Sequence, residues 1–237
     1  MKNRIDLYDD GIGFVELVDF MGSDLTIVNS ARVSFGKHKK EIDQKDKRLI
    51  NYLVKHRHTS TFEHNVATFR VCVPLFVRSQ HMRHRTWAYN EISRRYTDVD
   101  IEFYCPKEFR TQHENNRQAS NPEGLINPLI DAASISGGSY ADYMVRMHHK
   151  DSLRLYNKLI DNGVCREQAR GVLPQNMYTK YYGTCNLSNL LKFISLRTHE
   201  GAQWEIKELS LGMLSIVEGL WPVAVGAYRE HNKSGEV

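Results

Sequence analysis

Apolar residues recur every three or four positions in several segments of the chain, and this spacing predicts helices there. The segments are 24–31, 47–56, the stretch from Pro74 through Met82, 140–162, 165–173, the stretch from Asn186 through Ile194, and about 202–221. Gly163 is expected to close the longest of these helices as a left-handed cap, and Asn186 to cap the start of another. Helices therefore predominate in the predicted fold.

Two segments show the features of β-strands instead. Every second residue from Ala67 to Val73 is apolar, and the run 177–184 is aromatic and rich in residues that favour strands. The polar stretch 110–138 is interpreted as a loop over the surface. Together these patterns predict an α+β fold in which an antiparallel sheet is flanked by helices.

The composition adds few restrictions. The chain has 237 residues, of which 41% are hydrophobic and 25% are charged, as in an ordinary globular protein. No linker divides it, so one domain over 1–237 is expected.

No apolar run approaches membrane-spanning length and residues 1–10 lack an apolar leader, which predicts a cytoplasmic protein with no membrane partner. The four cysteines form no C-x-x-C pair and are expected to be reduced thiols.

The arginines are concentrated between Arg78 and Arg95, in a chain of formal net charge +4. This local positive charge favours an anionic ligand, either a mononucleotide or a polymer. A lone R-x-R pair usually belongs to a solvated helix face. Here, however, the basic residues are interleaved with Trp87, Tyr89 and Asn90, which suit a planar, phosphorylated ligand.

The same segment contains a longer motif. Arg83-His84-Arg85 is followed after seven residues by Ser93, and Glu91 lies between them. This motif resembles the signature of the flavin-dependent thymidylate synthases. The longer form of the motif is also present, with Asn90-Glu91 and a downstream Arg95-Tyr96. Further blocks that resemble this family, in the family's order, are 14–19, 31–35, 58–64, Tyr104 with Pro106, 166–174, 196–197 and 202–206, so the resemblance covers about 14–221.

The resemblance implies one compact catalytic domain and a definite reaction. The enzyme would be a methyltransferase that converts dUMP to dTMP, with 5,10-methylenetetrahydrofolate as carbon donor and FAD, reduced by NADPH, as hydride source. It would form a homotetramer with active sites at subunit interfaces, and it would have no nucleic-acid partner and no resident metal.

The resemblance also implies a set of dUMP-binding residues. They are Gln80, His81, Met82, Arg83, Glu91, Ile92, Ser93, Arg94, Arg95, Arg170 and Arg197. Forked guanidinium groups suit a phosphate monoester. Arg197 is implied to lie against the uracil ring and to favour ionisation at N3, whereas without the resemblance it would be a helix arginine that complements the dipole. Ser93 has no visible base to activate it, so it is expected to orient dUMP.

A second set is implied for the flavin. It comprises His58, Ser60, Arg83, His84, Arg85, Glu91, Asn186, Leu187, Ser188 and Lys192. No G-x-G-x-x-G follows a strand, so this would not be a Rossmann-type site. His58, which alone would more often be an ordinary surface or core histidine, is implied to lie beside the flavin. With Arg197 and Ser93 it completes the candidate catalytic residues, and no cysteine nucleophile is expected.

Two other classes of function remain open at this point. Arginines interleaved with aromatic residues also occur in nucleic-acid-binding modules, although the small net charge argues against one. Histidines such as His56, His58 and His64 suggest a metal hydrolase, but they form no accepted ligand motif.

Overall fold

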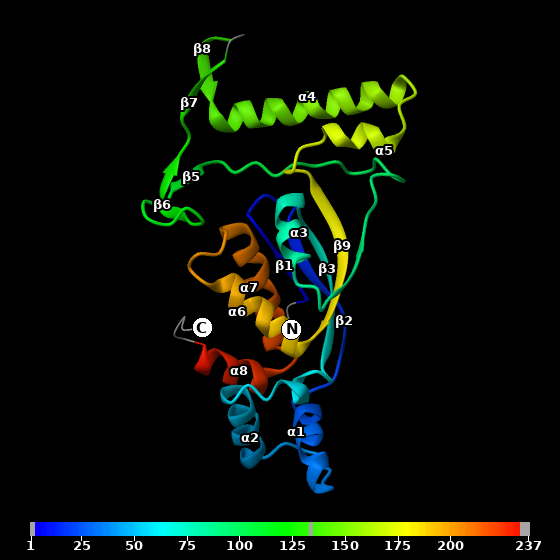
Figure 1. The fold of residues 1–237 in the computed structure, drawn as a ribbon, viewed down its shortest axis with the longest axis vertical. Coiled ribbons are helices and arrows are strands. Elements are labelled where there is room, and N and C mark those ends of the chain that lie inside the picture. The colour runs from blue at the N-terminus through cyan, green and yellow to red at the C-terminus, as the bar shows by residue number, and fades with distance from the viewer. Residues whose placement is uncertain (1–2, 133–134, 233–237) are drawn as a thin grey trace. The chain divides into compact units, whose positions relative to one another are not determined.

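Helices and strands both occur along the chain in this computed structural model, which describes residues 3–132 and 135–232 (Figure 1). The strands are β1 (Arg4–Asp6), β2 (Phe14–Met21), β3 (Val66–Pro74), β4 (Ala88–Glu91), β5 (Phe109–Gln112), β6 (Ser120–Ile126), β7 (Leu129–Ala132), β8 (Ile135–Tyr140) and β9 (Tyr178–Asn186). The α-helices are α1 (Asp24–Arg32), α2 (Gln44–Lys55), α3 (Leu75–His81), α4 (Ala141–Asp161), α5 (Arg166–Ala169), α6 (Leu187–Thr198), α7 (Trp204–Glu218) and α8 (Pro222–His231). Short 3-10 helices are η1 (Val33–Phe35), η2 (Thr59–Phe62) and η3 (Arg170–Val172).

These elements fall into two units. The first comprises Met1–Cys72, Gln80–Asn90 and Tyr181–Val237, and the second comprises Val73–Ser79 and Glu91–Lys180. The chain passes between the units several times, so neither is a simple N-terminal or C-terminal half. Whether they form the single domain expected from the sequence stays a prediction.

The main sheet has the strand order β1-β2-β3-β9-β4. Strand β2 pairs antiparallel with both β1 and β3, with Phe14 opposite Cys72, and a bulge interrupts the second pairing between Leu17 and Asp19. The apolar alternation of β3 has the expected effect, because Ala67, Phe69 and other residues of that row are buried.

Helices of the first unit enclose its core. Helix α7 packs on β1 and β2, and it comes close to the sheet at Gly212, where an added Cβ would lie 2.9 Å from Val15. Helix α6 packs on α7, and α8 contacts both α7 and α2 (Figure 1). The carboxylate of Asp24 accepts hydrogen bonds from Val223 N and Ala224 N, which caps the start of α8.

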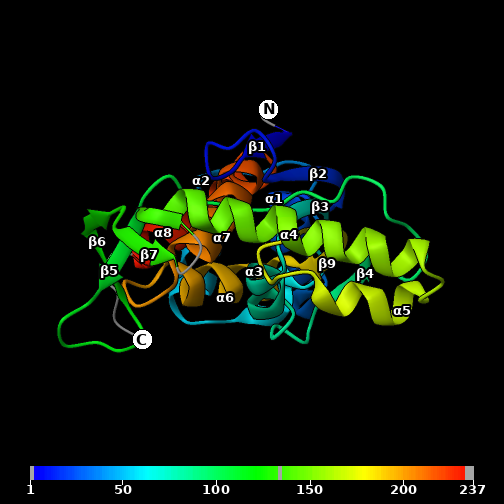
Figure 2. The same ribbon diagram turned by 90° about the horizontal axis from the view of Figure 1, so that it is seen from above.

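The second unit is built around α4. Helices α4 and α5 run side by side in both views (Figure 2), and a small core of Tyr156, Ala169, Leu173 and Met177 lies with them. Two hairpins, β5 with β6 and β7 with β8, complete this unit. Helix α4 ends at Asp161, and Gly163 follows with a φ of +84°, as expected for a left-handed position.

Three expectations about individual elements were wrong. The stretch 110–138 contains paired strands, because backbone pairing orders a segment that has no clear side-chain alternation; its residues 133–134 lie outside the described ranges. The last predicted helix, about 202–221, corresponds to α7, which ends earlier at Glu218, and the further helix α8, which begins at Pro222, was not predicted. Pro74 ends β3, and α3 begins one residue later.

The predicted α+β class, with antiparallel strands and flanking helices, is confirmed. Asn186 caps α6 as expected, because its side-chain oxygen accepts a hydrogen bond from Asn189 N at 2.9 Å. Within 3–132 and 135–232, no helix is both long and apolar enough to cross a membrane.

Candidate active site

The end of α3 brings the first group of predicted residues together. Gln80 and His81 form the last turn of this helix, and the chain then turns through Arg83 and Arg85 into β4. Met82 is half-buried within this turn, whereas both arginines are exposed. The buried strand β3 is therefore followed by the short helix α3 and then by a polar turn.

His81 lies beneath this turn as a neutral, buried residue. Its side chain is 0% exposed, and its Nδ1 lies 2.7 Å from the hydroxyl of Tyr181. The rings of Trp87, Tyr89 and Phe193 surround it. Burial, with smaller contributions from neighbouring cationic groups, lowers the pKa of His81 to about 3. Its ring therefore supports the turn and does not face solvent.

Arg197 is held by two residues of this turn. Its Nε donates to His84 Nε2 at 3.2 Å, and one terminal nitrogen donates to the Gln80 carbonyl at 3.3 Å. Burial and then the charge of Arg197 lower the pKa of His84 to about 4, so the imidazole is neutral near pH 7 and can accept this bond. Burial, followed by Arg83, lowers the pKa of Arg197, but guanidinium groups remain protonated at neutral pH.

The side chain of Gln80 continues this network towards α7. Its Nε2 donates to Gln203 Oε1, and Gln203 Nε2 donates to Glu205 Oε2 at 2.9 Å. Glu205 is 4% exposed in the first turn of α7. Gln203 and Glu205 were not among the predicted site residues, although both lie in the 202–206 block that resembles the family.

The predicted flavin residues of the first unit come from two adjoining segments. His58 and Ser60 lie at η2, which contacts α6; Asn186 caps that helix, and Leu187, Ser188 and Lys192 belong to it. The two segments are joined because Leu187 N donates to the Asn65 carbonyl at 2.7 Å.

Ser188 is the strongest local sign of a polar ligand in this region. It is 5% exposed, and its Oγ has no hydrogen-bond partner in the described parts of the chain. Buried hydroxyl groups are normally paired. In the same unit Arg83 and Arg85 are exposed and form no ion pair with any described carboxylate. These donors fit the phosphates and the polar ring edge of a flavin dinucleotide.

In the second unit, Glu91 is already paired. It accepts two hydrogen bonds from Arg78 Nε, at 3.0 and 2.9 Å, and one from Thr179 Oγ1 at 2.7 Å. Arg78 and Thr179, which hold this carboxylate, were not among the predicted site residues; the position of Arg78 at the edge of the basic cluster was the only signal for it. Ile92 follows Glu91, and its backbone N–H donates to the Lys180 carbonyl.

The remaining predicted residues of this unit differ in accessibility. Arg94 is buried and donates to the carbonyls of Val99 and Asp100, which orders the loop after Ser93. Arg95 is exposed and lies 3.4 Å from Glu167. Arg170 is exposed at the end of α5. Arg95 and Arg170 are thus accessible to an anion, whereas Arg94 is part of the scaffold.

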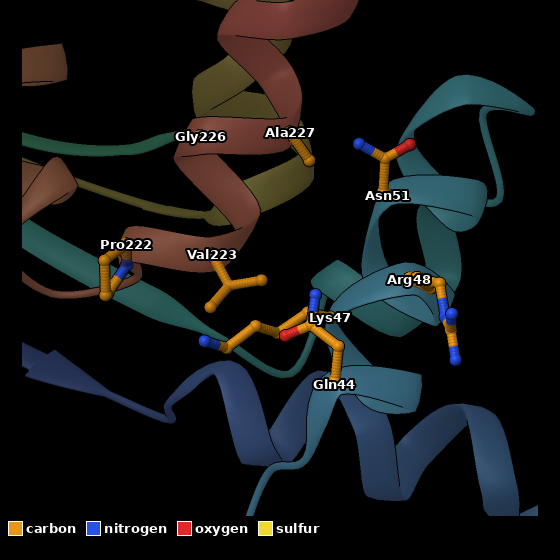
Figure 3. Close-up of a pocket in the computed structure, with 8 residues that line it drawn as sticks. All are labelled: Gln44, Lys47, Arg48, Asn51, Pro222, Val223, Gly226 and Ala227. Atoms are coloured by element: carbon orange, nitrogen blue, oxygen red, sulfur yellow. The ribbon is translucent and has the colours of Figure 1, made fainter.

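A separate groove of about 340 Å³ lies between α2 and α8 (Figure 3). Its lining residues are Gln44, Lys47, Arg48, Asn51, Pro222, Val223, Gly226 and Ala227. None of these residues was predicted to bind a ligand. This groove therefore does not coincide with the predicted ligand site.

The chain is thus an α+β protein whose first unit brings together the half-buried guanidinium of Arg197, the neutral imidazole of His84 and the amide of Gln80. This combination suits a planar anionic ligand. Residues 16–223 match the family model described as "Thymidylate synthase complementing protein". The curated relatives include flavin-dependent thymidylate synthases from Thermus thermophilus, 43% identical with 94% of this chain and 78% of the relative covered, and from Thermotoga neapolitana, 39% identical with 95% and 94% covered. The chain belongs to the flavin-dependent thymidylate synthase family.

Solved structures agree with this assignment. The chain is similar to the UMP/dUMP methylase PolB from Streptomyces cacaoi bound with 5-Br dUMP, with a TM-score of 0.80, 33% identity, and 98% of this chain and 100% of the other covered. A second structure of PolB, bound with 5-Br UMP, gives a TM-score of 0.78, 32% identity, and coverage of 98% and 99%.

Proposed function

We propose that this protein catalyses the reductive methylation of dUMP to dTMP, with 5,10-methylenetetrahydrofolate as carbon donor and NADPH as reductant of a bound FAD. The observation that carries the proposal is the arrangement around Arg197, where Gln80 and the neutral His84 hold a half-buried guanidinium in a fixed position. The chain's similarity to flavin-dependent thymidylate synthases, and the brominated nucleotides bound to PolB, support this choice of ligand.

Arg197 is suited to the base of the nucleotide. A guanidinium stays charged near neutral pH, and in a partly dehydrated site it stabilises an anion more strongly than it would in water. Because the Nε of Arg197 donates to His84, the plane of the guanidinium, and with it the direction of its terminal nitrogens, is fixed. Arg197 would therefore bind the uracil edge and stabilise negative charge at N3, which raises electron density at C5.

Exposed arginines would bind the phosphate of the nucleotide. Arg83, Arg95 and Arg170 are the accessible arginines of the predicted set. Ser93 has no basic side chain bonded to its hydroxyl among the described residues, and that hydroxyl accepts a bond from Arg95 N at 3.3 Å. We assign Ser93 to orienting the substrate.

The residues around η2 and the start of α6 would hold the flavin. When bound, FAD would supply the hydride that completes the methyl group. Ser188 Oγ and the exposed Arg83 and Arg85 supply donors, and His58, whose ring stacks on Tyr52, borders the same region. We further propose that the enzyme works as a homotetramer with its sites at subunit interfaces.

No cysteine is assigned a chemical role. Cys72 and Cys185 are buried, and burial raises the pKa of the Cys185 thiol, which disfavours the reactive thiolate. Cys105 and Cys165 lie outside the residues proposed for the nucleotide and the flavin. Activation of the uracil ring is therefore assigned to Arg197 instead of a thiolate.

The first experiment is an absorbance spectrum of the purified protein, followed by an assay of dTMP after addition of FAD, dUMP, 5,10-methylenetetrahydrofolate and NADPH. Flavin absorbance bands and dTMP are the expected results. UMP is tested in parallel, because the PolB structures contain both brominated nucleotides. Absence of flavin binding and of methylated product after FAD addition would refute the proposal, and salt-sensitive RNA binding would then favour the nucleic-acid alternative.

A further inference from the structure

A line of hydrogen bonds connects a buried carboxylate to the proposed nucleotide site. Glu205 accepts from Gln203 Nε2 at 2.9 Å, and Gln203 Oε1 accepts from Gln80 Nε2. Glu205 is 4% exposed, while Gln203 and Gln80 are half-buried. The line therefore begins in the core of the first unit and ends at half-buried Gln80, in the last turn of α3.

The carboxylate of Glu205 determines how the two amides in this line are oriented. An ionised carboxylate can only accept hydrogen bonds, so it selects the NH₂ end of the Gln203 amide. The oxygen end of Gln203 then faces Gln80 and selects the NH₂ end of that amide in turn. Gln80 is left with its Oε1 and one N–H for a ligand. With Gln80 flipped, two amide oxygens would face each other without a proton between them.

We propose that Glu205 and Gln203 are positioning residues, which fix the orientation of the Gln80 amide and hence the donor and acceptor that the nucleotide meets. This inference rests on the proposed function, in which Gln80 contacts dUMP. Neither residue needs to touch the substrate, because each acts through the next amide in the line.

The same network also supports Arg197. The backbone carbonyl of Gln80 accepts from Arg197, so a shift of Gln80 would move the guanidinium as well. At the other end, the hydroxyl of Tyr8 donates to the backbone carbonyl of Glu205 at 2.9 Å, which holds the first turn of α7. The line thus joins the start of α7 to the end of α6 through one residue of α3.

The test measures dUMP binding in variants that preserve or abolish the fixed orientation of the Gln203 and Gln80 amides. Glu205→Gln replaces an obligate acceptor by a group that can donate or accept, so the orientation of Gln80 is no longer specified. The KM and Kd for dUMP should rise about fivefold to thirtyfold, while the Kd for FAD remains unchanged. The matched control is Glu218→Gln, the same change at an exposed residue near the end of the same helix.

A rescue variant separates this role from a general structural one. In the double variant Gln203→Glu/Glu205→Gln, the carboxylate moves to position 203, where it can accept from both Gln80 and the new amide. The orientation of Gln80 is then restored, and dUMP affinity should return to within about threefold of the wild type. A double variant that binds no better than Glu205→Gln would overturn the inference.

A double-mutant cycle gives an independent answer. If Glu205 acts through Gln80, Glu205→Gln should cause no further loss of dUMP affinity in a Gln80→Ala background. Additive losses would overturn the inference. Should Glu205→Gln fail to fold, Gln203→Ala replaces it in the cycle, because Gln203 is only half-buried. A wild-type protein that binds neither dUMP nor FAD would instead refute the proposed function itself.

Discussion

Replacement of His81 by glutamine should change how the stability of the protein depends on pH. His81 is fully buried, and its pKa falls from 6.5 to about 3 in the folded chain. As the pH decreases through 6.5, the unfolded chain binds a proton at this residue but the folded chain does not. Protonation therefore favours the unfolded state, and the free energy of unfolding is lost between about pH 7 and pH 3.

The size of the effect follows from these two pKa values. Each unit of pH between them costs about 1.4 kcal/mol, so His81 should lower the free energy of unfolding by roughly 2 kcal/mol at pH 5 and roughly 3 kcal/mol at pH 4. The pKa of His84 and of His149 is also lowered by burial, and their protonation acts in the same direction. Both remain in a His81→Gln variant, so their contribution cancels in the difference.

The measurement is urea unfolding of wild type and His81→Gln between pH 4.5 and 9, at one protein concentration because assembly would alter the apparent stability. Loss of the imidazole lowers stability at high pH, since it removes packing and the bond to Tyr181. The gap between the two proteins should be constant above about pH 8 and shrink by roughly 2 kcal/mol at pH 5. Parallel curves across the whole range would refute the argument that His81 is held neutral by burial.

Three further changes test other contacts. Arg197→Lys keeps the charge but removes the forked donor, so kcat/KM for dUMP should fall about 10-fold to 100-fold. The control Arg229→Lys, at an exposed ion pair, should leave kcat/KM unchanged. Equal activities of the two variants would contradict the role of the forked guanidinium. Asn186→Ala removes the cap of α6 and should lower the free energy of unfolding by about 1 kcal/mol in urea titrations; no loss would mean that this cap contributes nothing. Gly22→Ala places a Cβ at a φ of +87°, 2.8 Å from Asn65 Oδ1, and should cost about 1–3 kcal/mol; an unchanged melting temperature would show that this turn relaxes.

The sequence motif predicted only some of the residues in the proposed site. Arg83-His84-Arg85 and Arg197 lie far apart in sequence, and only the resemblance to a family linked them before the structure. Gln203 and Glu205 carried a signal only as part of a block shared with the family, because an amide and an acid near a helix start usually serve as capping groups. The hydrogen bonds from Gln80 to Gln203 and from Gln203 to Glu205 depend on the packing of α7 beside α6, which local spacing does not specify.

Local chemistry along the chain determined the longer helices, the strand β3 and the caps at Asn186 and Gly163, since these depend on side chains a few residues apart. It also determined the motif from which the family was inferred. Tertiary structure alone decided that described parts of 110–138 form paired strands, that Glu91 is paired with Arg78, and that His81 is buried and neutral. Each of these outcomes depends on which distant groups replace water around a backbone segment, a carboxylate or an imidazole, and a one-dimensional pattern does not contain that information.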